Sequence, residues 1–193
     1  MRLFPSLVIL MFVFSSFSAI AELRVRPSQW ATPIIGSELD NLYQVDSHLF
    51  RSEQPDEEDF DALASFGIKE VLNLREYHSD KNEVAELKLD LTLHHLRLRT
   101  SKVTQKDIIK ALIIIKKSKK PILVHCWHGS DRTGAVIAAY RIIFNQWSKM
   151  QAIDELVNGG YGYHARVYPN IIHLIDRLDV EAIKKSLNFL GDQ

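Results

Sequence analysis

The segment HCWHGSDRTG, at residues 125–134, constrains the fold of this chain more than any other feature. It follows an apolar run at 122–124 and leads into a stretch, 133–144, that is apolar on nearly every side. The first run is typical of a buried strand and the second of a buried central helix. A strand, a loop and a helix in this order direct backbone N–H groups and the positive end of the helix at one concave spot, which favours anion binding.

Two side chains of this segment have the chemistry to use such a spot. Cys126 stands at its mouth, where a helix N-terminus and a guanidinium can lower the pKa of a thiol from about 8.5 to roughly 3.5–7.5 and so produce a nucleophile. Arg132 follows six residues later, and its planar fork can grip two phosphate oxygens. Thr133 can donate a hydrogen bond to the sulfur, and His125 can orient the loop from below. A buried and inert cysteine is the alternative, and these neighbours argue against it.

Strand and helix signals alternate through the rest of the chain. Strands are predicted at 42–45, 48–51, 68–74, 91–98 and 122–124. Helices are predicted at 56–67, 79–87, 104–120, 133–144, 148–160, 169–178 and 179–187, with capping boxes at Thr104 and Ser148. Strands that alternate with helices, followed by a helical C-terminal third, predict a single α/β domain with a central, mostly parallel sheet flanked by helices.

The first 21 residues have the layout of a secretion signal. A basic start precedes an apolar run at 3–14 and a small-residue end at 19–21, which predicts cleavage before Glu22. The run is too short to span a bilayer comfortably, so no stable membrane anchor is expected after cleavage. We therefore expect a periplasmic or secreted protein with an irregular lead-in at 22–40 and one domain at 41–193.

The composition argues against several classes of function. Lysine plus arginine and aspartate plus glutamate number 24 each, which gives no general case for binding nucleic acid. Cys126 is the only cysteine, so neither an internal disulfide nor a redox mechanism with a resolving thiol is available. The histidines show no spacing such as HExxH, and we expect no metal and no other cofactor.

The signature segment also carries a family resemblance. It matches the pattern H-C-x5-R-[ST]-G, and the chain resembles the cysteine-dependent protein tyrosine phosphatase superfamily, in particular its small dual-specificity branch. Weaker support comes from LFRSEQP at 49–55, VLNLR at 71–75 and GGYG at 159–162. Together with the export signal, the chain is similar to bacterial periplasmic tyrosine phosphatases over about residues 41–178.

The resemblance implies a phosphatase fold and a two-step reaction through a phosphocysteine, without a metal. By the same resemblance Cys126 is the nucleophile and Arg132 the phosphate clamp, with His125, Thr133 and Gly134 in support. The substrate-binding residues would be the rest of the loop: Trp127, His128, Gly129 and Ser130. We expect His128 at the rim and Trp127 packed beneath the loop. The expected partner is a phosphorylated protein, with phosphotyrosine favoured.

One departure from the family leaves the general acid open. The family places an acidic aspartate in the loop that corresponds to TSKV at 100–103, where this chain has no carboxylate. Asp131 is one candidate, since some lipid phosphatases of the superfamily carry an aspartate there, although it can equally brace the loop. Asp107 is more naturally a helix-start residue, and Asp80 comes from another loop. A weak or missing acid would favour aryl phosphates, because a tyrosine leaving group has a pKa near 10.

Two further functions compete with a protein tyrosine phosphatase. Asp131 suggests a phosphatase of inositol phosphates or phosphoinositides, which would need a basic pocket wider than one tyrosine. The missing acid suggests a phosphate-binding pseudophosphatase. The intact pair of Cys126 and Arg132 argues against the second, because a pure binder has little need of a nucleophile.

Overall fold

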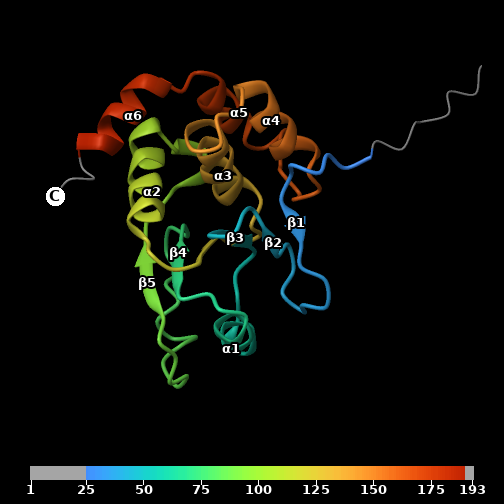
Figure 1. Cartoon of the computed structure of the whole chain (residues 1–193), viewed down its shortest axis with the longest axis vertical. Helices are drawn as coiled ribbons and strands as arrows, with labels where there is room; N and C mark the ends of the chain where they lie inside the picture. The colour runs from blue at the N-terminus through green and yellow to red at the C-terminus, as the bar shows by residue number, and fades with distance from the viewer. Residues whose placement is uncertain (1–24, 190–193) are drawn as a thin grey trace, which may run out of the picture.

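A six-stranded sheet runs through the centre of the computed structural model, which describes residues 25–189 (Figure 1). Its strands are β1 (Thr32–Pro33), β2 (Tyr43–Gln44), β3 (Leu49–Ser52), β4 (Glu70–Asn73), β5 (Thr92–His95) and β6 (Ile122–His125). In space they follow the order β1-β2-β3-β6-β4-β5. The first two pairs are antiparallel and the other three are parallel, as predicted for a mostly parallel sheet.

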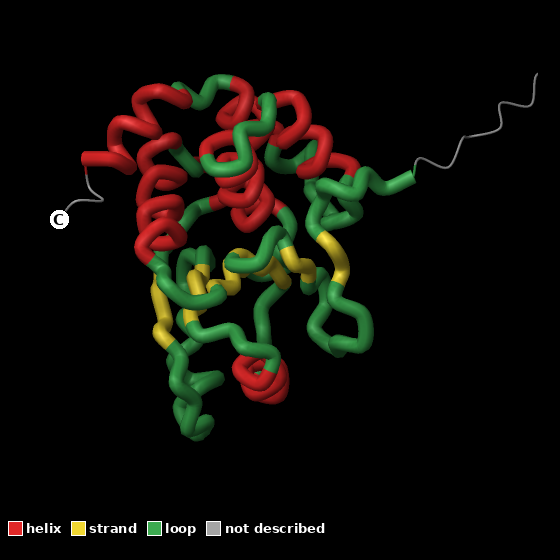
Figure 2. Tube along the Cα trace, in the orientation of Figure 1, coloured by secondary structure: helices red, strands yellow, loops and turns green. Residues whose placement is uncertain are grey.

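Helices cover both faces of this sheet (Figure 2). They are α1 (Glu57–Ser65), α2 (Gln105–Lys117), α3 (Asp131–Ile143), α4 (Lys149–Asn158), α5 (Pro169–Asp176) and α6 (Val180–Phe189), with a 3-10 turn, η1, at Thr100–Lys102. Helices α2 to α6 lie on one face and α1 lies alone on the other (Figure 1). The predicted α/β domain with a flanked central sheet is therefore confirmed. Among the described helices, none has both the length and the apolar character to cross a membrane.

Strand β6 is buried along its whole length, and its first three residues are apolar, as is typical of a strand covered on both faces. Ile122 and Val124 point into the larger hydrophobic cluster beneath helices α2 to α6, and Cys126 belongs to the same cluster. Leu123 points into the smaller cluster with Phe60, under α1. The strand has parallel neighbours on both sides, so its carboxyl end opens at the same edge as those of β3 and β4. The signature loop begins at that edge.

Several helices begin at the capping side chains that the sequence predicted. The capping boxes of Thr104 with Asp107 and of Ser148 with Gln151 are both present, and Asp56 caps α1. These side chains accept hydrogen bonds from backbone N–H groups that have no partner within the helix. Local side-chain chemistry therefore sets where these helices begin.

Two predicted elements are wrong or too long. No helix forms at 79–87, where Val84 N–H donating to the Asp80 carbonyl gives only a single turn. The Asp80 side chain is engaged with distant residues instead, so tertiary contacts outweigh the short helix signal. The strand predicted at 91–98 is shorter in the structure, where β5 ends at His95 because its partner β4 ends at Asn73. Beyond that point isolated backbone hydrogen bonds continue, from Leu96 N–H to the Asn73 carbonyl and from Leu98 N–H to the Leu74 carbonyl.

The residues that follow the predicted signal pack onto the domain. Within the lead-in, β1 adds a two-residue strand to the sheet. Arg26 donates hydrogen bonds to the carbonyl oxygens of Gly159 and Ala31, each at 2.6 Å, and to the hydroxyl of Tyr161 at 2.8 Å. The lead-in is thus attached to the core. The predicted signal at 1–21 lies outside the described residues.

A buried ion pair joins helices α3 and α4. Arg141 donates from Nε to Oε2 of Glu155 at 2.9 Å and from Nη2 to Oε1 at 3.1 Å. The same carboxylate accepts hydrogen bonds from the backbone N–H of Ala31 at 2.7 Å and the hydroxyl of Tyr161 at 3.0 Å. Both charged residues are almost completely buried, at 3% and 2% exposure. Glu155 therefore ties together two helices, the lead-in and the loop after α4.

Candidate active site

The loop of the signature segment begins at the carboxyl end of β6 and ends where α3 begins at Asp131. Gly129 has φ +65°, and a Cβ atom at that position would overlap the backbone of Ser52 at the end of β3. Gly134 faces Leu156 so closely that a Cβ atom would collide with that side chain. Glycine is therefore required at 129 for the loop to lie against β3, whereas a larger residue at 134 would force the Leu156 side chain to move.

The Arg132 side chain leaves the first turn of α3 and lines a cavity of about 440 Å³. Trp127, His128 and Asp131 of the signature loop line the same cavity. One guanidinium nitrogen, Nη1, lies 3.5 Å from the carbonyl oxygen of Leu98, and Nε is buried without a hydrogen-bond partner. Arg132 thus has donors left for an anion inside this cavity.

A second arginine, Arg75, comes from the loop after β4 and lines the same cavity. Its guanidinium stacks 4.1 Å from the ring centroid of Trp127 and donates to Oε1 of Gln54 at 2.9 Å. Burial and the neighbouring charge of Arg132 lower the pKa of Arg75. Two cations this close favour a bound anion, which neutralises both. The VLNLR fragment contained this residue, but nothing in its spacing indicated that it would meet Arg132.

A third arginine, Arg51, supports the loop from behind. It is only 1% exposed, donates from Nη2 to the carbonyl of Gly129 at 2.6 Å, and stacks 3.6 Å from the ring centroid of Tyr161. Burial lowers its pKa, while the acidic groups nearby, Cys126 among them, act in the opposite direction. A charged residue directly after two apolar residues of a strand was the signal that sequence analysis passed over.

His125 is fully buried below the loop. Its Nε2 donates to Oδ2 of Asp80 at 3.0 Å, and its Nδ1 lies 3.3 Å from the carbonyl oxygen of Cys126. The other oxygen of Asp80 accepts from Gln54 at 2.9 Å and from Asn73 at 2.8 Å. Burial alone would raise the pKa of Asp80, but these hydrogen bonds outweigh it and leave the pKa below its usual value. Asp80 therefore stays ionised and orients His125 instead of supplying a proton.

The substitution Asp80→Asn should make acid unfolding less dependent on pH. A carboxyl whose folded pKa lies below its ordinary value of about 3.9 stabilises the fold above that value, and the contribution is lost as the pH falls toward the folded pKa. Asparagine does not titrate, so the variant lacks this dependence. Urea midpoints measured from pH 7 to pH 2 should show the wild type losing its advantage below about pH 4. If the difference between the urea midpoints of the wild type and the variant stayed constant from pH 7 to pH 2, the lowered pKa assigned to Asp80 would be contradicted.

The remaining candidates for the general acid differ in position. Asp107 accepts hydrogen bonds from the backbone and hydroxyl of Thr104 and is not among the residues that line the cavity. Asp131 does line it, but both of its oxygens are occupied: Oδ1 accepts from the backbone N–H of His164 at 3.0 Å, and Oδ2 lies 3.0 Å from His164 Nδ1. Asp131 thus braces the loop around His164, a residue that sequence analysis did not connect with the site.

Other loop residues also have defined places. Cys126 is buried at 2% exposure, and the hydroxyl of Thr133 is buried with no partner among the described residues, which leaves it free to donate to a sulfur. Ser130 is buried and donates to the carbonyl of His128, so it shapes the loop from inside. His128 is exposed and lines the cavity. Trp127 does not pack beneath the loop: it is 54% exposed, because Arg75 holds it at the rim.

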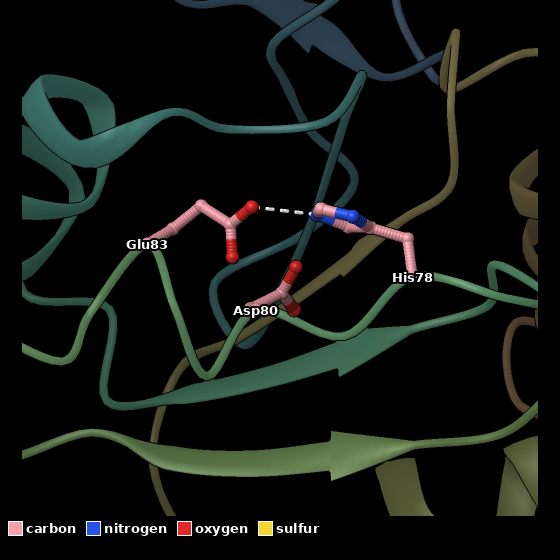
Figure 3. A group of neighbouring side chains, drawn as sticks. All are labelled: His78, Asp80 and Glu83. Atoms are coloured by element: carbon pink, nitrogen blue, oxygen red, sulfur yellow. Dashed lines mark ion pairs between the residues drawn. The ribbon is translucent and has the colours of Figure 1, made fainter.

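Figure 3 shows His78, Asp80 and Glu83, which bring ligand-type atoms within 4.8 Å of one another. Nε2 of His78 pairs with Oε1 of Glu83 at 2.6 Å. The Asp80 carboxylate already accepts from three protein donors. Each of these side chains thus has a protein partner, although Oε2 of Glu83 is buried without a hydrogen-bond partner of its own.

The fold and this site define a known class of enzyme. Residues 38–182 match the model of the tyrosine phosphatase family, so the chain belongs to that family. The phosphatase class predicted from the signature segment is confirmed at this level.

Two curated relatives differ in what they are named for. The dual specificity protein phosphatase TpbA of Pseudomonas aeruginosa is 27% identical over 124 residues, covering 63% of this chain and 56% of TpbA. The inositol diphosphatase SIW14 of Saccharomyces cerevisiae is 26% identical over 159 residues, covering 78% of this chain and 56% of SIW14. The chain therefore spans just over half the length of these relatives.

Solved structures agree on the fold. The crystal structure of P. aeruginosa TpbA matches with a TM-score of 0.75 at 24% identity, covering 85% of this chain and 99% of that one. The catalytic core of SIW14 in complex with citrate matches with a TM-score of 0.65 at 23% identity, covering 84% and 96%.

Proposed function

We propose that this chain is an exported protein tyrosine phosphatase that transfers the phosphoryl group to Cys126 and then to water. The observation that carries the proposal is the junction of β6 and α3, where a lone cysteine opens a loop that ends at an arginine with free donors in a cavity. The export signal expected at residues 1–21 supports a periplasmic or secreted location.

The first step follows from the chemistry of these groups. The Cys126 thiolate attacks phosphorus, and Arg132 with the loop N–H groups binds the equatorial oxygens of the transferring phosphoryl group. The bond to the tyrosine oxygen breaks, and phosphocysteine forms. In the second step water attacks phosphorus, phosphate leaves, and the sulfur recovers its electron pair as a thiolate. Thr133 stabilises the departing sulfur by donating its free hydroxyl.

A second candidate substrate is an inositol phosphate. The specific observation in its favour is the pair of arginines in the cavity, where Arg75 lies beside Arg132. A phosphotyrosine needs one arginine for its single phosphate, whereas a ligand with several phosphates would engage both. The relative named as an inositol diphosphatase points the same way.

Substrate turnover by the exported form, in buffer with a chelator, tests the proposal. Phosphotyrosine peptide should be hydrolysed at least about 100-fold faster than phosphoserine peptide, because an alkoxide leaves only with full proton transfer. Acid quenching during turnover should trap phosphate on sulfur. A diphosphoinositol phosphate that outcompetes phosphotyrosine would favour the second candidate. If the phosphotyrosine peptide and the diphosphoinositol phosphate both bound tightly but neither was hydrolysed, the chain would be a phosphate-binding protein and the proposal would be overturned.

A further inference from the structure

His164 enters the cavity from the loop after α4, and its position is fixed from two sides. Its backbone N–H and its Nδ1 each meet one oxygen of Asp131 at 3.0 Å. The Asp131 side chain is only 10% exposed and belongs to the first turn of α3, next to Arg132. The His164 side chain is 45% exposed and lines the same cavity as Arg132. An imidazole is thereby held in a fixed relation to the phosphate-binding arginine.

This contact sets the orientation of the ring. A carboxylate can only accept hydrogen bonds, so Nδ1 of His164 carries the proton that points at Asp131. Nε2 lies on the opposite side of the ring and is left for another partner. An aspartate that holds a histidine in this way is a recurring arrangement in enzymes that transfer protons.

We propose that His164 is the proton donor for the leaving group and that Asp131 is its positioning residue. The inference rests on the proposed phosphatase function. It accounts for the absence of a carboxylate from residues 100–103, because the proton comes from a different loop. It also accounts for Asp131, whose two oxygens are both occupied and whose carboxyl is therefore poorly placed to donate.

The proton balance closes over both steps. As the thiolate sulfur bonds to phosphorus, the ester oxygen leaves with its electron pair and takes the proton from Nε2 of His164. The neutral ring then accepts a proton from the attacking water, whose oxygen bonds to phosphorus while the sulfur leaves as a thiolate. Phosphate is released and the imidazolium is restored, so no further reactant is needed.

Several charged groups face His164 from the elements around it. Asp131 is in contact, and the ring of His128 lies 5.8 Å from that of His164, centroid to centroid. Arg132, Arg75 and Glu76 line the cavity in front of it. Asp40 and Glu53 line an adjoining hollow, of about 410 Å³, on the other side of the histidine.

Glu76 is the rival donor, since it is the other carboxylate among the described residues that line the cavity. Glu76 raises the pKa of the Tyr77 hydroxyl, so its carboxylate lies toward a side chain that is 88% exposed. His164, in contrast, is held against the helix that carries Arg132. A carboxyl group is also a poorer match than an imidazole to proton transfer near neutral pH.

The variant His164→Asn provides the test, because it keeps the backbone N–H that anchors the loop to Asp131. Turnover should fall about 100-fold for phenyl phosphate and hardly at all for 2,4-dinitrophenyl phosphate, whose leaving group needs no proton. The descending limb of the pH profile for phenyl phosphate should disappear. His173→Asn, on α5 and outside the cavity lining, is the matched control and should behave as the wild type.

The outcomes separate the two claims. Equal losses on both esters, or an unchanged pH profile, would overturn the role of His164 while the active wild type still upheld the phosphatase. If the loss of turnover depended more strongly on the leaving group in Glu76→Gln than in His164→Asn, the proton would be assigned to Glu76 and the inference would be overturned. A wild type inactive on every ester would refute the proposed function itself. Matching melting temperatures for His164→Asn and the wild type would show that folding is not the cause.

Discussion

Replacing Cys126 with serine is expected to abolish turnover, by about 10⁴-fold or more, while phosphate binding remains. A serine hydroxyl ionises far less readily than a cysteine thiol, so the variant lacks an effective nucleophile at this position. The variant keeps the cavity, so inorganic phosphate should bind it about as tightly as it binds the wild type. Initial rates on para-nitrophenyl phosphate and titration calorimetry with phosphate measure the two effects.

Arg132→Lys is the informative companion to this substitution. It keeps one positive charge in the cavity but loses the planar fork, so phosphate affinity and turnover should both fall. The serine variant is thus expected to separate binding from chemistry, whereas the lysine variant changes both. If the Cys126→Ser variant kept an activity within tenfold of the wild type, a group other than Cys126 would be the one that attacks phosphorus.

The largest loss of stability is expected from Glu155→Ala. The substitution leaves the Arg141 guanidinium buried without its carboxylate, and it also removes the acceptor for Ala31 N–H and the Tyr161 hydroxyl. Removing one partner of a buried ion pair costs roughly 3–5 kcal/mol, because the remaining charge is uncompensated. Urea unfolding followed by far-UV circular dichroism should show a much lower midpoint.

The control for this prediction is an ion pair on the surface. Glu181 and Lys184 lie 3.3 Å apart on α6, with side chains 84% and 46% exposed. Solvent screens such pairs, so Glu181→Ala should leave the midpoint almost unchanged. Similar shifts for both variants would mean that Glu155 acts only as an ordinary helix residue.

Much of the fold could be predicted from sequence because its determinants are local. The capping side chains of Thr104 and Ser148 lie within three residues of the backbone N–H groups that they satisfy. The apolar run at 122–124 is typical of a strand covered on both faces, and the structure places one there. The helix expected at 79–87 failed for the opposite reason. The Asp80 side chain is committed to His125, far along the chain, and no pattern within the segment reveals this.

The residues of the site also divide into those that local sequence reveals and those that only the fold brings together. Cys126 and Arg132 could be identified because one continuous loop holds both. Arg75 and His164 could not, because each reaches the cavity from its own loop and only the folded sheet brings them together. Arg51 carried a visible signal, a charged residue in a buried strand, and buried charges generally have a partner that the fold must supply.

The contacts of Arg26 have a practical consequence for producing this protein. Arg26 holds Tyr161, Tyr161 stacks on Arg51, and Arg51 fastens the carbonyl of Gly129. An expression boundary drawn at the start of the family match, residue 38, would delete the first link of this relay. Such a shortened protein would keep Arg51 behind the signature loop but would lose the hydrogen bond from Arg26 that holds Tyr161 in place, so its activity should be compared with that of a protein that begins before Arg26.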